Sequence, residues 1–461
     1  MTEVEKPAQN SGWLRFLPDF VRQRLSGRHG LQAILGNSAW QVADKIVRMG
    51  VAIFVSLWVA RYLGPHRFGQ LNYALALTSV FTAVSNLGLD SIVIRELVKF
   101  PERKNDLLGS AFVLKLLGAL LTLLIAIILV SILRPGDKLI LLLTALSAAG
   151  FLFQSIPINL YFQSKVQAKY IVLSANGGFL LMALAKVVLI LIGAPLIAFA
   201  WAGFVEFVLA AGFMLIAYSY NRQDILRWKV SFLDMCSLLR ESWPLVFTGI
   251  SVMISMRVDQ VLIGQMLDDK QVGLYSAAVK LSELWYFIPV SIAASTYPAL
   301  VDSKKRGEDL YYRRLQQLYD MLVTLGLAVA LAMTILSWPM VRLMYGPAYA
   351  ASAGALRILI WSGIPVCFGV AWSNWMILEG RAKMLFYFQL TGAIVNIILN
   401  LVLIPRFGIV GSALATLISY WIVITILAAI MKPQRKGLVM LGKAMISFPT
   451  LFRTMAMRSS S

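Results

Sequence analysis

Ten charged residues fall inside long apolar stretches of this chain. The basic ones are Lys45, Arg48, Lys115, Lys186, Arg257 and Lys280, and the acidic ones are Asp44, Glu206, Asp259 and Glu283. A charge at the centre of a membrane costs about 2.5–3.5 kcal/mol on insertion scales, so such residues mark function by default. Because cations outnumber anions six to four, an anionic substrate is favoured. We predict that the six cations line its cavity.

Spacing along a helix indicates which of these charges could pair. Asp44 and Arg48 are four residues apart, and Lys280 and Glu283 are three apart, so each pair could share one helix face. We expect the four acidic residues either to couple transport to an ion or to pair with the cations. For Asp44 and Arg48, an ion pair that only orients helices is an equally good explanation.

Two amides form a further candidate site. Asn396 and Asn400 lie four residues apart on one predicted helix face. They suit either contact with a sugar or hydrogen bonding between helices, and helix packing is the favoured interpretation. Histidine and cysteine occur only twice each and never together, which predicts no disulfide, metal site, cofactor or catalytic cluster.

The elements that must position these residues are membrane helices. Apolar residues make up 59% of the chain and charged residues only 14%, against roughly 45–50% and 25% in soluble domains. Runs of about 20 apolar residues predict spanning helices. The twelve predicted spans are Asn37–Tyr62, Phe68–Ile94, Leu107–Leu133, Leu139–Phe162, Ile171–Ile192, Leu196–Tyr218, Trp243–Leu267, Val272–Tyr297, Leu318–Val341, Ala355–Leu378, Phe386–Ile404 and Val410–Met431.

The distribution of basic residues predicts the orientation. With the N-terminus inside, 28 of the 42 Lys and Arg residues fall in cytoplasmic segments and eight in outer segments or span ends. The positive-inside rule therefore accounts for the net charge of +20 without nucleic acid as a partner. We predict a multi-pass protein of the cytoplasmic membrane, bacterial or archaeal, with both termini in the cytoplasm.

An internal repeat divides the chain. At an offset of 204 residues, Val59–Leu63 aligns with Ile263–Leu267, and Phe68–Gly69 aligns with Val272–Gly273. Two halves of six spans share one orientation, so they predict parallel lobes that bind substrate at their interface. The predicted segments are a cytoplasmic tail (1–36), a first lobe (37–220), a cytoplasmic linker (221–239), a second lobe (240–431) and a second cytoplasmic tail (432–461).

Several short motifs occur in a characteristic order along the chain. The motifs of the first half are Ala60–Pro65, Phe68–Gly69, Leu87–Asp90 and Arg95–Leu97, and those of the second half are Asp259–Gly264, Val272–Tyr275, Tyr297–Leu300, Asn396, Asn400, Leu403–Pro405, Gly408, Gly411, Ala413, Ala415–Thr416 and Ser419–Tyr420. In these residues the chain resembles the polysaccharide-transporter (Wzx-type) flippases. They belong to the multidrug/oligosaccharidyl-lipid/polysaccharide exporter superfamily.

This resemblance implies a two-lobed helical transporter that flips undecaprenyl-pyrophosphate-linked oligosaccharides by alternating access. Its product would feed O-antigen, capsule or exopolysaccharide synthesis, with a polysaccharide polymerase as a further partner. The deep cations Arg257 and Lys280 suit such a substrate, because a pyrophosphate is costly to move through a low-dielectric region unless cations neutralise it. Lys45 and Lys115 lie nearer the predicted cytoplasmic side, where snorkelling to the surface explains them as well.

Two other functions are open to a protein with many membrane spans. An ion-coupled multidrug exporter of the same superfamily would favour a cation-poor cavity centred on carboxylates, and it is the alternative. A membrane enzyme would need acidic or histidine clusters at the membrane surface. No such cluster is apparent in the sequence, so we predict that the protein is not an enzyme.

Overall fold

The structure is a computed structural model that describes residues 29–427, 429 and 435–446, without the side chains of 29–47, 382, 383 and 427. Within these residues the regular structure is helical. The helices are α2 (His29–Val80), α3 (Thr82–Asn86), α4 (Asp90–Lys99), η2 (Pro101–Arg103), α5 (Lys104–Leu133), α6 (Lys138–Gln154), α7 (Ile158–Ser164), α8 (Ala168–Leu191), α9 (Leu196–Tyr220), η3 (Ile225–Arg227), α10 (Phe232–Met266), α11 (Asp269–Glu283), α12 (Phe287–Arg306), α13 (Glu308–Tyr345), η4 (Pro347–Tyr349), α14 (Ser352–Leu359), η5 (Ile360–Ser362), α15 (Gly363–Leu378), α16 (Ala382–Ile422) and η6 (Val423–Leu427).

The helices are long and apolar enough to cross a membrane. Eight helical segments among the described residues are each long and apolar enough to span a membrane. Two further pairs of helices are long and apolar enough if each pair is taken as one span bent by 44°. Two long helices each contain a break, because Gly64 in α2 and Gly408 in α16 have φ angles of +68° and +58°. Counting each of these as two helices gives twelve spans within the described residues. The prediction of an all-α polytopic membrane protein is confirmed.

The turn between the first and second predicted spans differs between the two halves. In the first half, Gly64 adopts a left-handed φ that side chains disfavour, and Pro65 then starts the next helical segment. At the equivalent place in the second half, Asp268 caps α11 by accepting a hydrogen bond from the Gln271 backbone N–H at 2.8 Å. The repeat therefore conserves the turn but not the residues that make it.

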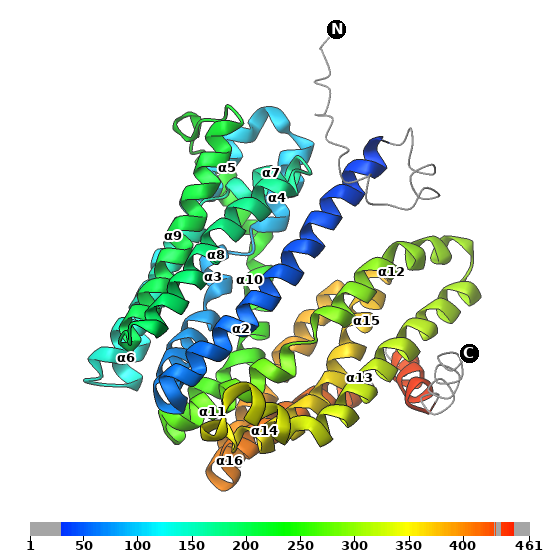
Figure 1. Cartoon of the computed structure of the whole chain (residues 1–461). Helices are drawn as coiled ribbons and strands as arrows, with labels where there is room; N and C mark the ends of the chain where they lie inside the picture. Colours follow the sequence, from blue (N-terminus) through cyan, green and yellow to red (C-terminus); the bar gives the residue numbers. More distant parts are fainter. Residues whose placement is uncertain (1–28, 428, 430–434, 447–461) are drawn as a thin grey trace, which may run out of the picture.

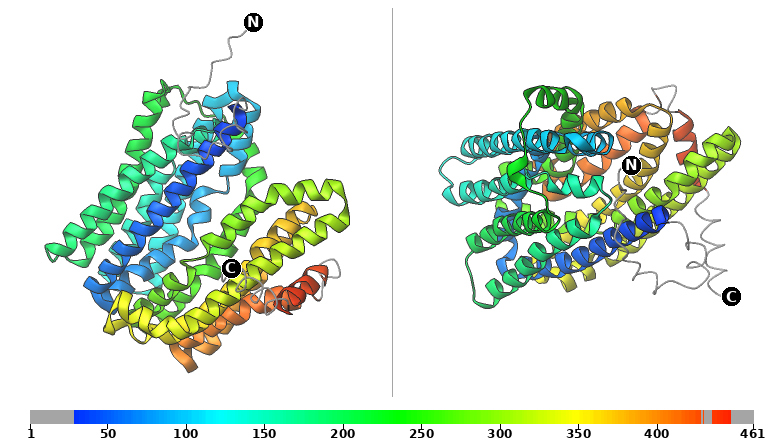
Figure 2. Two further views of the ribbon diagram at one scale, coloured as in Figure 1. Left: turned by 45° about the vertical axis from the view of Figure 1, so that its right-hand side comes forward. Right: turned by 90° about the horizontal axis from the view of Figure 1, so that it is seen from above.

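The helices form two lobes, α2–α9 and α10–α16, which meet at one end of the molecule and mostly diverge toward the other (Figures 1 and 2). The first part of α10 is the exception, because it stays against the first lobe, where Asp234 pairs with Arg103. Two glycines allow the backbones of the two lobes to pack closely where the lobes meet. A Cβ added at Gly69 would lie 1.6 Å from the Asp269 carbonyl oxygen, and one added at Gly273 would lie 1.9 Å from the Pro65 carbonyl oxygen. The predicted repeat aligns residue 65 with residue 269 and residue 69 with residue 273. The Gly69–Asp269 contact and the Gly273–Pro65 contact are therefore equivalent positions of the two halves.

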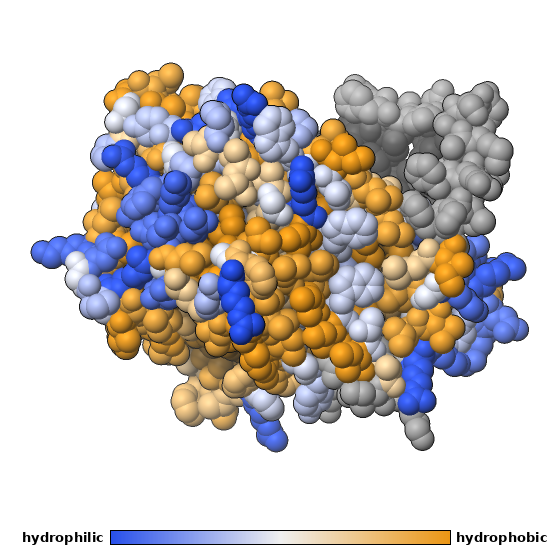
Figure 3. All heavy atoms as spheres, turned by 90° about the horizontal axis from the view of Figure 1, so that it is seen from below, coloured by the Kyte–Doolittle hydropathy of each residue, from blue (hydrophilic) through white to orange (hydrophobic). Residues whose placement is uncertain are grey.

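Polar bonds join the lobes at the same end. Arg134 forms an ion pair with Asp269 at 3.0 Å, and the Tyr349 hydroxyl donates to the Ala60 carbonyl at 2.7 Å. Viewed from this end, the surface is mostly apolar with scattered hydrophilic residues (Figure 3). By the count of basic residues, this end is the predicted outer face.

Two predicted boundaries differ in the structure. Helix α10 begins at Phe232, so the connection between the lobes is residues 221–231, shorter than the predicted linker of 221–239. Ser231 ends it, because its hydroxyl accepts the Asp234 backbone N–H at 3.3 Å as an N-cap. Helix α2 begins at His29, inside the predicted N-terminal tail, and residues 1–28 lie outside the described part of the chain.

Candidate functional site

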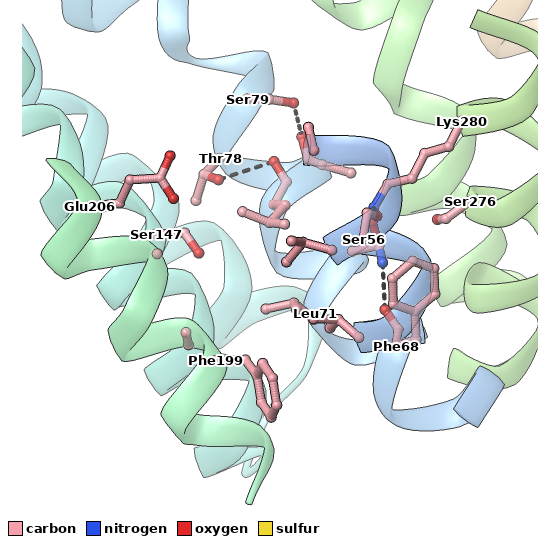
Figure 4. A pocket seen from close by; sticks show the side chains of 18 of the residues that line it. Ser56, Phe68, Leu71, Thr78, Ser79, Ser147, Phe199, Glu206, Ser276 and Lys280 are labelled. Carbon is pink, nitrogen blue, oxygen red and sulfur yellow. Dashed lines mark hydrogen bonds between the residues drawn. The ribbon is translucent and has the colours of Figure 1, made fainter. Parts of the chain in front are cut away.

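A cavity of about 550 Å³ lies between the lobes, where they diverge. Helices α2, α6, α8 and α9 of the first lobe form most of its wall, and α10 and α11 contribute the wall of the second lobe. Figure 4 shows Glu206 on one side and Lys280 on the other, with serine side chains between them. Both lobes therefore contribute charge to one shared space, as the parallel repeat predicts for a transporter.

Five charged residues line this cavity, three basic and two acidic. Lys186 pairs with Glu206 at 2.9 Å, within the first lobe. Arg257 meets Glu283 with both of its terminal nitrogens, at 3.0 and 3.3 Å, within the second lobe. Among the charged residues of the lining, this pairing leaves one excess positive charge, on Lys280.

Lys280 is held by neutral groups of the other lobe. Its Nζ donates to the Ser56 hydroxyl at 3.1 Å and lies 4.6 Å from the centre of the Phe68 ring. A cation over an aromatic face is attracted to it, but more weakly than to a carboxylate. No carboxylate among the described residues pairs with Lys280, and its side chain is exposed to the cavity. It is therefore available to an anionic group.

The remaining wall combines aliphatic side chains with polar and aromatic ones. Its hydroxyl and amide groups come from Ser56, Asn72, Thr78, Ser79, Thr82, Ser147, Gln260 and Ser276, and its aromatic rings from Phe68, Phe151, Phe179, Phe199, Phe204 and Phe207. Hydroxyls and amides can donate and accept hydrogen bonds, as sugar hydroxyls do. The wall can therefore contact a polar, uncharged group beside the anion-binding lysine.

The local pairing expected between Lys280 and Glu283 is absent from the described ion pairs. Glu283 faces α10 instead, where Arg257 binds it. The reason is geometric, because α10 and α11 are neighbours and bring residues 26 positions apart into contact. Sequence reasoning also missed Ser56 and Phe68 as partners of Lys280, although Phe68 belongs to one of the motifs noted above.

Three other predicted cations lie outside the cavity lining or outside the described side chains. Lys115 is buried in α5 and pairs with Asp90 at 2.7 Å, so it does not line the cavity. Arg48 donates to the Asn176 side chain at 2.9 Å and stacks over Phe179, a cavity residue. The side chains of Asp44 and Lys45 lie outside the described part of the structure, so their predicted roles stay predictions.

The predicted contact of Asn396 and Asn400 with a glycan is not supported, because both side chains are fully buried within the second lobe. Asn400 accepts from Ser412 at 2.7 Å and donates to the Asn396 side chain at 3.1 Å. The network extends to Asp259, which accepts from Tyr275 and Thr416 at 2.6 and 2.8 Å. The amides therefore pack helices together, and Asp259 is buried away from the central cavity.

Two protein-family models match parts of this chain. A family model described as "Polysaccharide biosynthesis protein" matches residues 34–304, more than half of the chain. The chain belongs to this family. A second model, MatE, matches residues 244–402. This match includes nearly all of the first lobe and the helices that carry Arg257, Lys280 and Glu283.

Curated relatives match parts of the chain. The "Probable flippase AglR" of Haloferax volcanii is 25% identical over 214 residues, which are 44% of this chain and 42% of that protein. The "Uncharacterized membrane protein MJ1375" of Methanocaldococcus jannaschii is 27% identical over 186 residues, 40% of this chain and 42% of that protein. The matched region thus spans less than half the length of each relative.

Solved structures share the fold along most of the chain. An inward-facing multidrug resistance MATE family transporter of the MOP superfamily has a TM-score of 0.68 at 14% identity, covering 88% of this chain and 96% of that one. The lipid II flippase MurJ, in an inward closed conformation, has a TM-score of 0.66 at 15% identity, covering 90% and 92%. An outward-facing MATE structure scores 0.61 at 14% identity, covering 91% and 96%. The two-lobed fold is shown by these likenesses.

Proposed function

We propose that the protein is a flippase that moves lipid-linked oligosaccharides across the cytoplasmic membrane. In this proposal the lipid is an undecaprenyl-type carrier, joined to the glycan through a pyrophosphate. Membership of the polysaccharide biosynthesis family and the match to a probable flippase support the class of substrate. The protein binds and releases this molecule without changing its covalent structure, and a polysaccharide polymerase would use the product.

The observation that carries the proposal is the excess positive charge on Lys280. Among the described residues, a hydroxyl and an aromatic ring hold this cation, which is costly at membrane depth, and a phosphate would neutralise it. Arg257 lines the same cavity and could also contact phosphate by releasing one oxygen of Glu283. The hydroxyl and amide groups beside them would then bind the sugars nearest the pyrophosphate.

The shape of the two lobes supports transport by alternating access. Their closely packed glycines and polar bonds close the predicted outer end, while most of their helices, α10 excepted, diverge toward the predicted cytoplasmic end (Figure 1). The TM-score is higher for an inward-facing neighbour than for an outward-facing one, 0.68 against 0.61, which supports the same state. Flipping would require the outer contacts to separate while the lobes close around the opposite end.

An ion-coupled drug exporter is the second candidate, because the MatE model matches the second lobe and MATE transporters share the fold. For such an exporter we expect a cation-poor cavity that is centred on carboxylates. The described lining has three cations and two carboxylates, and this balance favours the flippase.

Deleting the gene tests the proposal in cells. We expect lipid-linked oligosaccharide to accumulate in the inner leaflet, because its synthesis continues while its export stops. The measurement is the fraction of this lipid that an impermeant glycan-oxidising reagent reaches in intact cells, compared with inverted vesicles. An unchanged distribution of the lipid, together with increased sensitivity to cationic drugs, would favour the exporter instead.

A further inference from the structure

An ion pair of the first lobe lines the central cavity. Lys186 of α8 donates to Glu206 of α9 at 2.9 Å, and the two side chains are 22% and 28% exposed. Both residues line the same cavity as Lys280, and Figure 4 shows Glu206 across the cavity from that lysine. The first lobe therefore brings a cation to the shared space, together with a carboxylate that neutralises it.

Close packing of α8 against α9 holds this pair at the cavity wall. A Cβ added at Gly178 of α8 would lie 2.9 Å from the Ala210 backbone nitrogen and 3.2 Å from the Glu206 carbonyl oxygen, both of α9. Glycine at position 178 thus lets the two backbones approach, and Lys186 follows about two turns later on α8. The packing of two helices, and not the spacing along one of them, brings the lysine to the carboxylate.

The bond between Lys186 and Glu206 is one that an anionic ligand can replace. An ammonium group has three donors, and the hydrogen bonds among the described residues occupy one donor of Lys186. Arg257, in contrast, meets Glu283 with two of its nitrogens. An ion pair that water reaches contributes little to stability, because water screens its charges. A phosphate could therefore take the place of the Glu206 carboxylate at a small cost.

The three cations of the cavity lining come from both lobes and lie close together. Lys186 of α8 and Arg257 of α10 are both near enough to Lys280 of α11 to repel its charge. An anion placed between like charges relieves their repulsion, and the effect is large where the dielectric constant is low. A pyrophosphate that joins a lipid to a glycan has two phosphate groups, each with one negative charge. It can therefore contact a cation of each lobe at the same time.

We infer that Lys186 is the contact of the first lobe for the substrate pyrophosphate, and that Glu206 is the residue that displaces the phosphate again; this inference rests on the proposed function. Before the lipid enters, Glu206 neutralises Lys186. One phosphate then takes Lys186 from Glu206 while the other contacts Lys280, so that the substrate links the two lobes. When the outer contacts separate, Glu206 binds Lys186 again and the phosphate leaves.

The variant Glu206→Gln tests the role of the carboxylate. The probe is a short-chain polyprenyl pyrophosphate joined to N-acetylglucosamine, titrated against the purified full-length protein. We expect this variant to bind the probe about fivefold more tightly, because no carboxylate competes for Lys186. In liposomes with saturating probe it should flip about fivefold more slowly, because release then limits the rate. Glu241→Gln removes a carboxylate that pairs with Arg95 outside the cavity, and it should change neither quantity.

The double variant Lys186→Gln/Glu206→Gln tests the contact itself. It leaves the net charge of the cavity unchanged, yet it should bind the probe about 10-fold more weakly than the unmodified protein, because a hydrogen bond from a charged group to the phosphate is lost. Normal binding by the double variant, or an unchanged affinity in Glu206→Gln, would overturn the inference while the proposed function stands. Failure of the unmodified protein to bind the probe would instead overturn the proposed function on which the inference rests.

Discussion

Lys280→Met is expected to lower the rate of flipping about 10- to 100-fold, because a hydrogen bond to a charged group is worth about 1.5–3 kcal/mol. Methionine keeps the length of the side chain and its contact with Phe68, so the cavity keeps its shape. Glu283 is bound by Arg257 and is not left unpaired by this change. The amount of protein in the membrane should therefore stay the same.

Two matched variants make this result specific. Lys270→Met removes an exposed lysine of the same helix that does not line the cavity, and it should transport normally. Lys280→Arg keeps the charge and should retain part of the activity. The measurement is the initial rate of flipping at equal protein abundance. A normal rate for Lys280→Met would make this lysine structural and remove the main support for a phosphate at this position.

Arg257→Gln is expected to affect both folding and transport. It leaves the Glu283 carboxylate without its cation, which would destabilise a fully buried pair by about 3–5 kcal/mol. Because the two side chains are 27% and 25% exposed to the cavity, we expect a smaller loss of about 1–2 kcal/mol, from screening by water. The lower thermal stability of the purified variant and its lower abundance in membranes measure this effect.

The double variant Arg257→Gln/Glu283→Gln separates the two roles of the arginine. Removing both charges should restore the thermal stability of the protein, since an amide pair can hydrogen bond without leaving an uncompensated charge. Transport should stay low, because the substrate phosphate has lost one of its cations. Arg306→Gln is the control, since its pair with Asp302 is at the surface and contributes little. Full transport by the double variant would show that Arg257 serves only to bind Glu283.

The sequence predicted the fold well because the fold depends on features that repeat locally. Apolar runs define the helices, and the 204-residue repeat predicted two similar lobes. The predicted linker extends to residue 239 although α10 begins at Phe232, because the first turns of α10 mix polar and apolar residues and come before the continuous apolar run. In contrast, the breaks at Gly64 and Gly408 lie between predicted spans, after those that end at Tyr62 and Ile404.

The site was predicted less well, because partners come from other helices. Spacing along one helix suggested Lys280 and Glu283, yet the structure pairs Glu283 with Arg257 of α10 and places Lys280 against Ser56 and Phe68 of α2. Lys115 was expected in the cavity, but Asp90 binds it in the first lobe. Sequence identifies the charges at membrane depth, and only the packing of helices decides which of them remains unpaired.

Flipping by the purified protein in liposomes tests the central claim most directly. Two lipids with the same polyprenyl chain and the same glycan are compared, one joined through a pyrophosphate and the other through an uncharged linkage. The account predicts rapid flipping of the pyrophosphate lipid, and little or none of the uncharged lipid, by the unmodified protein. Equal rates for the two lipids, or efflux of cationic dyes with no flipping of either, would contradict it.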